Sequence, residues 1–369
     1  MDGTLLSNYD KAFDDIAADA TRRLGDLRHA ENALNEELET EVYRWAVETI
    51  GMMIFGIRLG CLDGEVHVPT VENKNPEKCV DDSTIDPCSL SKRSMEELTP
   101  AERLVRTCRT IADENYLIRS EGTLKPESAT FNGALKAFDR HFSLTEHFLI
   151  KALQSVSSAE LRPEQMLLDK LRPLERRILP LAADILLAGV DPMFYHLSLN
   201  AARQQRAHDE VSWSIASREA GAGCPELPYI AGCIREAMRL YPATGGVVRR
   251  TTEAIVVGGY EVPAGIDIVL AHGVTSKSEK QWGRAKDFIP ERWCKGSEPL
   301  QASRAHPYSS VPFGENCPAS GIAGKMLGSL VTRVVDRYRL EWHGPVPNLT
   351  TAGVNRIDPP YYFVLQNAA

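Results

Sequence analysis

The strongest candidate for chemistry in the sequence is Cys317, in the run HPYSSVPFGENCPASGIAG, just before an apolar helical pattern. A cysteine at a helix N-terminus has its thiolate form favoured by the helix dipole and by free backbone donors. The thiolate is the form of cysteine that binds metals. Taken alone, an inert buried cysteine remains the alternative, because cysteine is among the residues most often buried.

A second set of candidate residues carries charge. Glu236 and Arg239 stand three residues apart in IREAMRLYP, so they share one face of a predicted helix. Arg292 follows 53 residues later, in the segment Phe-Ile-Pro-Glu-Arg-Trp. Taken alone, Glu236 and Arg239 would form a surface ion pair, and the segment with Arg292 would be a separate loop held by aromatic burial.

A third candidate is Asp191, in the stretch Ala-Gly-Val-Asp-Pro-Met of a long apolar helical pattern. Pro192 removes one backbone hydrogen bond and is expected to kink the helix. On the local pattern alone, Asp191 would be an acid that caps the break which the proline induces.

Taken together and in order, these segments resemble the cytochrome P-450 superfamily of haem-thiolate mono-oxygenases. The resemblance runs from about Leu5 to Leu365 and is densest in the second half of the chain. It implies haem as the cofactor, with Cys317 as the axial iron ligand and Phe313 in the loop that carries it. It also implies that Asp191 delivers protons to dioxygen.

The same resemblance implies roles for four basic or acidic residues. Glu236, Arg239 and Arg292 would form a structural cluster that braces the haem face. Arg249 lies eleven residues before Tyr260, where the family has an arginine that contacts a haem propionate. An arginine at a strand edge is the alternative for Arg249.

Two motifs depart from the family pattern. The family reads Phe-Gly-x-Gly-x-Arg-x-Cys, whereas Phe313 and Cys317 are only four residues apart. A three-residue deletion explains the spacing; without it Ser320 would fall at the ligand position. Pro192 and Met193 replace both threonines of the oxygen-binding stretch. Without the threonine hydroxyl, we expect reduced oxygen to leak as peroxide.

Within the superfamily, YRWAVETIGMMIFGIRLGCLD and HPYSSVPFG are most similar to the mitochondrial class. That class implies a small lipophilic substrate such as a sterol or steroid, with dioxygen, a ferredoxin-type electron donor and association with the inner mitochondrial membrane. Arg235 matches a basic position used to dock the ferredoxin, with a solvated arginine as the alternative. Ser320 and Gly321 replace the basic pair that usually follows the cysteine.

The departures also support a second hypothesis from another class. The chain would then be a non-catalytic P-450-derived protein, or an incomplete gene product, that binds haem weakly or not at all. Relatives of full length carry a further upstream part with the first sheet and the first helices. We therefore expect a P-450 fold that lacks these N-terminal elements.

The pattern of apolar residues predicts a mainly α fold with a minor antiparallel β part. It is expected to form a single, partial domain over 1–369. Thr99 opens one helix with a capping sequence, Thr-Pro-Ala-Glu. The predicted segments are helices at 9–60, 145–211, 227–241 and 322–340, a surface loop at 63–97, a small sheet within 247–273, irregular chain at 287–318, a distal oxygen-binding helix at 181–206, and the haem-ligand loop with its proximal helix at 306–340.

Composition excludes several other classes of protein. The chain has 43% hydrophobic and 25% charged residues, as in an ordinary globular protein, and its net charge of -8 disfavours nucleic acid as a partner. None of the eight cysteines forms a CxxC pair, so neither a zinc cage nor a redox dithiol is predicted. Cys79 and Cys88 could pair in a loop. The first residues resemble no targeting peptide, and no apolar stretch approaches the roughly 20 residues of a membrane span.

Overall fold

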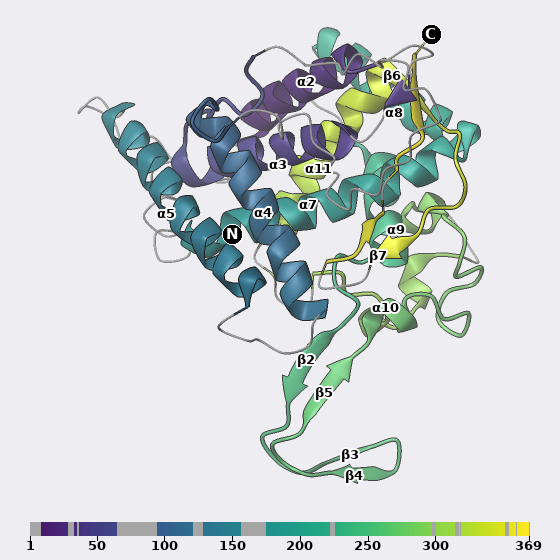
Figure 1. Ribbon diagram of the computed structural model, residues 1–369. Coiled ribbons are helices and arrows are strands. Elements are labelled where there is room, and N and C mark those ends of the chain that lie inside the picture. The colour runs from purple at the N-terminus through teal and green to yellow at the C-terminus, as the bar shows by residue number, and fades with distance from the viewer. Residues whose placement is uncertain are drawn as a thin grey trace, which may run out of the picture.

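The computed structural model describes most of the predicted elements. The described residues are 9–28, 33–34, 37–64, 94–120, 128–155, 175–221, 226–296, 300–313, 317, 319–350, 354–358 and 360–368. Within them the protein is mainly helical with small antiparallel sheets, which confirms the predicted fold class (Figure 1). Most of the predicted surface loop, with Cys79 and Cys88, lies outside the described residues.

The larger elements follow the predicted order along the chain. The helices are α2 (Asp10–Asp26), α3 (Glu37–Phe55), α4 (Pro100–Ser120), α5 (Ala129–Ser155), α7 (Glu175–Ser198), α8 (Ala201–Glu219), α9 (Pro228–Leu240), α10 (His272–Thr275) and α11 (Ser320–Arg337). The strands are β1 (Ala33–Leu34), β2 (Val247–Arg250), β3 (Ile255–Val257), β4 (Tyr260–Val262), β5 (Asp267–Leu270), β6 (Tyr338–Trp342), β7 (Leu349–Thr350), β8 (Arg356–Ile357) and β9 (Phe363–Asn367). A 3-10 turn spans Pro290–Trp293.

Side-chain caps explain where two of the helices begin. The Thr99 N–H donates to Glu102 Oε2 at 2.9 Å and the Glu102 N–H donates to Thr99 Oγ1 at 3.2 Å, so the predicted capping box opens α4. The Asn200 side chain accepts the Arg203 N–H at 3.0 Å and caps α8. The predicted distal helix at 181–206 therefore comprises most of α7, a break at residues 199–200 and the start of α8.

The prediction of one helix over 322–340 is wrong at its C-terminal end. Helix α11 stops at Arg337, and Tyr338 begins strand β6. From there Tyr338 and Leu340 are buried while Arg339 between them is exposed, which is the alternation of a strand with one face on the core. Pairing of β6 with β9 overrides the helical spacing of the apolar residues.

Four long helices form the body around which the other elements pack. Helix α3 lies along α7, and α2 lies along α11. Each of these helices contributes buried side chains to the core, among them Trp45 of α3 at 0% exposure. Lys325 to Asp10 at 2.5 Å and Arg333 to Asp14 at 2.8 Å join α11 to α2 at the surface. No helix in the described parts is both long and apolar enough to cross a bilayer.

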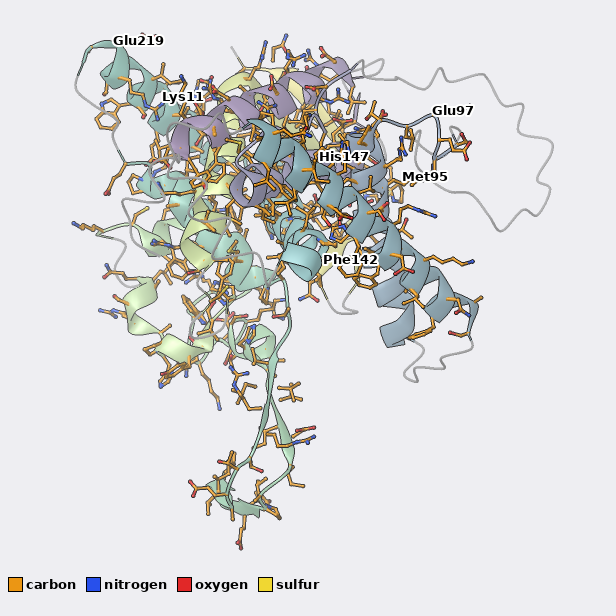
Figure 2. All side chains as sticks on the ribbon, turned by 90° about the vertical axis from the view of Figure 1, so that its left-hand side faces the viewer. Lys11, Met95, Glu97, Phe142, His147 and Glu219 are labelled. Atoms are coloured by element: carbon orange, nitrogen blue, oxygen red, sulfur yellow. The ribbon has the colours of Figure 1, made fainter. Side chains whose placement is uncertain are left out.

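The small sheets differ in how they meet the body. A three-stranded sheet of order β1-β9-β6 packs beside the helices. Strands β2 and β5 pair antiparallel from Val247↔Leu270 to Arg250↔Asp267 and continue into the hairpin of β3 and β4. Figures 1 and 2 both show this segment, residues 247–270, projecting from the body as an arm. Val256 at 72% and Tyr260 at 78% exposure show that the arm buries little of its surface.

Candidate functional site

The predicted charge cluster is present in the interior. Glu236 and Arg239 are fully buried and Arg292 is 1% exposed. Arg239 donates to Glu236 through Nε at 2.9 Å and Nη2 at 2.8 Å, and Arg292 Nε donates to the same carboxylate at 3.0 Å. The carboxylate thus has a bidentate partner and a second guanidinium, which offset its desolvation. We call these three residues the Glu236 cluster.

The Glu236 cluster also ties distant parts of the chain together. Beyond its bonds to Glu236, Arg239 donates to the backbone oxygens of Ser276 at 2.6 Å and Ala285 at 2.7 Å. Arg292 Nη2 donates to the carbonyl oxygen of Arg284 at 2.7 Å, and desolvation holds the Arg292 pKa below its ordinary value. The cluster therefore fixes α9, the loop at 276–287 and the 3-10 turn as one unit.

The close approach of the 3-10 turn to α9 depends on a glycine. A Cβ atom at Gly232 would lie 2.8 Å from the Pro290 carbonyl oxygen. A larger residue would push the turn away and pull Arg292 and the Trp293 indole, which donates to Glu236 at 3.0 Å, from the carboxylate. Sequence reasoning did not single out Gly232, although its position one turn before Glu236 on the same helix could have indicated it.

Cys317 lies three residues before α11 and is partly exposed. Its carbonyl oxygen accepts the Ser320 N–H at 3.2 Å, which leads the chain into the helix. Phe313 is partly buried and packs against the core. Residues 314–316 and 318 of the predicted haem-ligand loop lie outside the described residues. Cys317, the predicted iron ligand, thus lies just before the N-terminus of α11 and is partly exposed to solvent.

Asp191 lies inside the protein on α7. It is 0% exposed, and its Oδ2 lies 3.2 Å from the Tyr361 hydroxyl, whose single proton is shared between this oxygen and the Ile357 carbonyl oxygen, also at 3.2 Å. Tyr361 is itself 3% exposed and belongs to the C-terminal segment just before β9. Sequence reasoning missed Tyr361, since nothing in the local pattern links it to a residue 170 positions earlier.

The backbone next to Asp191 packs closely against two other helices. A Cβ atom at Gly189 would lie 3.0 Å from Leu327 Cδ1 of α11 and 3.6 Å from Met238 Cε of α9. Leu327 is seven residues into α11, or about 10 Å along its axis from Ser320 at 1.5 Å per residue. Gly189 therefore lies beside the middle of α11.

Arg249 is placed on the exposed arm. It pairs with Ile268 across the β2–β5 ribbon, and its guanidinium donates to the Val248 carbonyl oxygen at 3.2 Å. The structure therefore does not bring Arg249 to Cys317 by any contact among the described residues. Arg235 is exposed on α9, beside the buried Glu236.

His196, which the sequence reasoning also missed, lies next to the Glu236 cluster. Its ring stacks on Phe288 at a centroid distance of 4.7 Å and an angle of 3°. Desolvation lowers the His196 pKa to about 4. His196 therefore stays neutral and contributes to packing beside the Glu236 cluster. Among the described residues, no group of His, Cys, Asp and Glu side chains is arranged to bind a metal ion.

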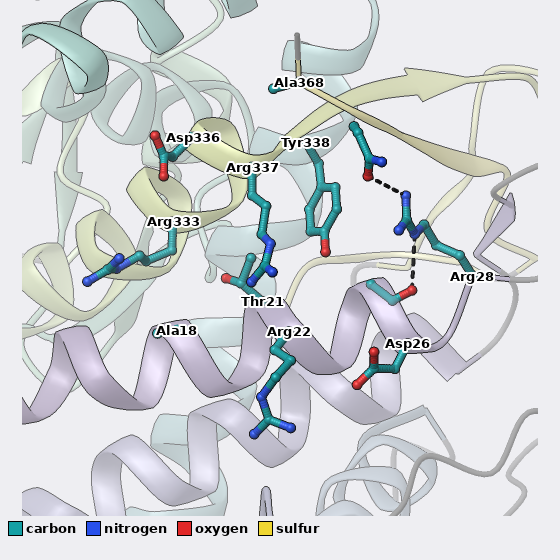
Figure 3. A pocket seen from close by; sticks show the side chains of 12 residues that line it. Ala18, Thr21, Arg22, Asp26, Arg28, Arg333, Asp336, Arg337, Tyr338 and Ala368 are labelled. Atoms are coloured by element: carbon teal, nitrogen blue, oxygen red, sulfur yellow. Dashed lines mark hydrogen bonds between the residues drawn. The ribbon is translucent and has the colours of Figure 1, made fainter. Parts of the chain in front are cut away.

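A polar pocket of about 600 Å³ lies elsewhere, between α2, α11 and β9 (Figure 3). Four arginines line it, namely Arg22, Arg28, Arg333 and Arg337. Both α2 and α11 end here, and arginines are favoured beside the partial negative charge of helix C-termini. Arg28 Nε donates to the Gly25 carbonyl oxygen at 3.0 Å in this way. The pocket contains none of the predicted site residues, so we assign it no catalytic role.

Comparison with known proteins identifies the family. The cytochrome P450 family model matches residues 2–365. Probable cytochrome P450 12b2, mitochondrial, from Drosophila melanogaster is 22% identical over 358 residues, covering 91% of this chain and 61% of the relative. Cytochrome P450 27C1 from Danio rerio is 24% identical over 354 residues, covering 90% of this chain and 60% of the relative.

A solved structure shows the same fold. Retinoic acid-bound cyanobacterial CYP120A1 has a TM-score of 0.69 and 17% sequence identity, with 100% of this chain and 76% of that chain covered. The chain spans about three-fifths of the length of the curated relatives it matches. The match over nearly its whole length shows that the chain belongs to the cytochrome P450 family, a family of haem-thiolate mono-oxygenases.

Proposed function

We propose that the chain is a haem-dependent mono-oxygenase that inserts one oxygen atom from dioxygen into a small lipophilic substrate. The observation that carries this proposal is the complete Glu236 cluster. Its buried charges would cost several kcal/mol if any partner were missing, yet every partner is in place. The cluster thus forms a rigid support beside the chain segment that leads to Cys317.

The donor set fits a haem group on one side. Cys317 would hold the iron, because its side chain is accessible and stands at the start of a helix that packs on the core. Phe313 would lie against the group from the same loop. When bound, haem supplies the activation of dioxygen, and the protein supplies position and surroundings. Arg249 remains a candidate for a propionate contact only if the arm folds towards the loop.

Partner, substrate class and location are proposed by analogy. The relatives named as mitochondrial support a mitochondrial location and a ferredoxin-type electron donor. The exposed Arg235 would contribute to docking of an acidic partner. The retinoic acid bound in the solved relative supports a lipophilic substrate, for which we keep a sterol or steroid as the specific proposal.

The test is a carbon monoxide difference spectrum of the reduced, haem-reconstituted chain. We expect a Soret band at the position typical of thiolate ligation. The band should disappear in Cys317→Ala and persist in Ser320→Ala, which changes a neighbouring exposed residue. An unchanged band in Cys317→Ala, or its loss in Ser320→Ala, would contradict the assignment of the ligand.

A second candidate function is a P450-derived protein without catalysis. The close packing of Gly189 on Leu327 favours it, because the stretch that should bind oxygen is in contact with a neighbouring helix. The replacement of both threonines by Pro192 and Met193 points the same way. A chain that is folded by circular dichroism but takes up no haem on reconstitution would support this candidate over the enzyme.

A further inference from the structure

The polar pocket between α2, α11 and β9 contains a buried hydroxyl group that no described residue binds. Tyr338 lines this pocket and is 4% exposed, yet its hydroxyl makes no hydrogen bond to any described residue. Figure 3 shows the hydroxyl end of the ring pointing from β6 towards α2. A polar group in such a position loses free energy unless water or a ligand binds it. The pocket therefore offers this hydroxyl to the molecule that fills it.

The Tyr338 hydroxyl is held in place from two sides. A Cβ atom at Gly25 would lie 2.1 Å from Tyr338 Oη, so a side chain at this position would displace the hydroxyl. The guanidinium of Arg28 lies over the Tyr338 ring, 5.1 Å from its centroid. Arg28 is itself fixed by its bonds to the Gly25 carbonyl oxygen at 3.0 Å and to Asn367 Oδ1 at 2.7 Å. A donor that is fixed before binding costs a ligand little entropy.

Two of the four arginines that line the pocket keep free donors for a ligand. Arg22 and Arg333 are each paired with an aspartate of α2. In contrast, the Arg337 side chain has no hydrogen bond or ion pair with any described residue. Arg28 uses its Nε and Nη1 atoms, which leaves Nη2 without a described acceptor. Guanidinium groups bind phosphate and carboxylate oxygens in pairs, so these two arginines suit an anion.

The acidic groups of the pocket restrict where an anion can bind. Figure 3 shows Arg337 and Tyr338 between Asp336 on one side and Asp26 on the other. The C-terminal ends of α2 and α11 add partial negative charge. An anionic group is therefore favoured only in the centre of the pocket, where the free donors lie. The two carboxylates can accept hydrogen bonds from hydroxyl groups on either side of it.

We propose that this pocket binds a phosphate monoester of a polyhydroxy compound, such as a sugar phosphate. The phosphate, with a charge of about −1.5 to −2 at neutral pH, binds Arg28, Arg337 and Tyr338, and the hydroxyl groups of the ligand donate to Asp26 and Asp336. The volume of about 600 Å³ is typical of small-molecule sites. No lining residue has an aliphatic side chain larger than alanine, which favours a soluble phosphate over the acyl chains of a lipid.

The proposal is tested without haem by calorimetric titration of the full chain with glycerol phosphate. We expect saturable binding to the wild type and at least about tenfold weaker binding to Arg337→Gln, because a hydrogen-bonded charge is lost. Tyr338→Phe removes only the hydroxyl and should weaken binding by about tenfold. Neither substitution removes a bond between described residues, so both variants should unfold at the same urea concentration as the wild type.

Arg218→Gln is the matched control. Arg218 is an exposed arginine in the last turn of another helix, α8, and it lies outside the pocket. Its substitution should leave the affinity for glycerol phosphate unchanged. A dissociation constant above about 10 mM for the wild type overturns the site. Equal affinities of the wild type and Arg337→Gln, or an equal loss in Arg337→Gln and Arg218→Gln, also overturn it.

Two further titrations define the class of ligand. Glycerol should not bind measurably, because it lacks the phosphate that the arginines hold. Vesicles that contain phosphatidic acid carry the same phosphate monoester on a lipid and should not retain the chain. Binding of glycerol as tight as that of glycerol phosphate overturns the role of the phosphate. Retention on the vesicles that is lost in Arg337→Gln overturns the proposal of a soluble ligand.

Discussion

Two arginine–carboxylate contacts in this protein share a geometry and differ in their surroundings. Arg239 binds Glu236 through Nε and Nη2 at 2.9 and 2.8 Å in the fully buried cluster. Arg250 binds Asp267 through the same two atoms at 2.7 and 2.8 Å on the exposed arm. In water the second pair gains little, because solvent screens the charges and either side chain can be hydrated instead. Contacts of similar length therefore stabilise the interior in the Glu236 cluster and contribute little at the surface of the arm.

The largest effect is expected from Glu236→Gln. The substitution keeps the shape of the side chain and removes the charge that Arg239 and Arg292 share, so two buried guanidiniums lose their counter-ion. We expect a loss of about 3–5 kcal/mol in the free energy of unfolding, measured by urea denaturation. A loss below about 1 kcal/mol would mean that water reaches the cluster and that the comparison with the arm does not hold.

A smaller loss is expected from Tyr361→Phe, which leaves a buried acceptor on Asp191 without this donor. An unmade hydrogen bond of this kind costs about 1–3 kcal/mol. Tyr362→Phe is the matched control, because the neighbouring side chain is 40% exposed and its hydroxyl reaches no described partner. Equal stability of the two variants in thermal denaturation would show that the hydrogen bond between Tyr361 and Asp191 contributes nothing to the stability of the fold.

The interior should also respond to acid. Desolvation lowers the pKa of His141 and of His196 from 6.5 to about 4. The unfolded chain therefore binds more protons between these values, and the free energy of unfolding falls as the pH drops from about 6.5 to about 4. Each histidine contributes up to about 1.4 kcal/mol per pH unit in that window.

The acid response has a control on the same helix. His141→Phe should reduce the slope of stability against pH, whereas His147→Phe, at an exposed position of α5 labelled in Figure 2, should leave it unchanged. An equal slope in wild type and His141→Phe would show that burial of His141 does not cause the loss of stability in acid. Urea denaturation at a series of pH values measures it.

The smallest effect is expected from Asp267→Asn on the arm. The bond to Arg250 lowers the Asp267 pKa, but both side chains are exposed to solvent. We expect no measurable change in the unfolding midpoint. A clear loss of stability would show that the arm is covered in solution. The contact of Arg250 with Asp267 would then stabilise the protein as a buried ion pair does.

Part of this structure could be predicted because the signals are local. The capping sequence at Thr99 opens α4 as expected, since the box joins residues three apart. The Glu236 cluster could be predicted from two signals. Glu236 and Arg239 share one face of a helix, and the segment with Arg292 resembles one found throughout the family. In contrast, the end of α11 at Arg337 depends on the distant strand β9, where Asn367 pairs with Tyr338 and draws it into a sheet.

By itself the sequence determined the fold class, the family and the residue types that can hold a metal or brace a core, because periodicity, caps and motifs are properties of neighbouring residues. Only the tertiary structure decided what each motif faces. Asp191 stands in a motif typical of an oxygen site, yet it is bonded to Tyr361, and Gly189 beside it packs on Leu327. The reason is that a helical pattern specifies which residues share a face, whereas the register of one helix against another is set by the packing of both.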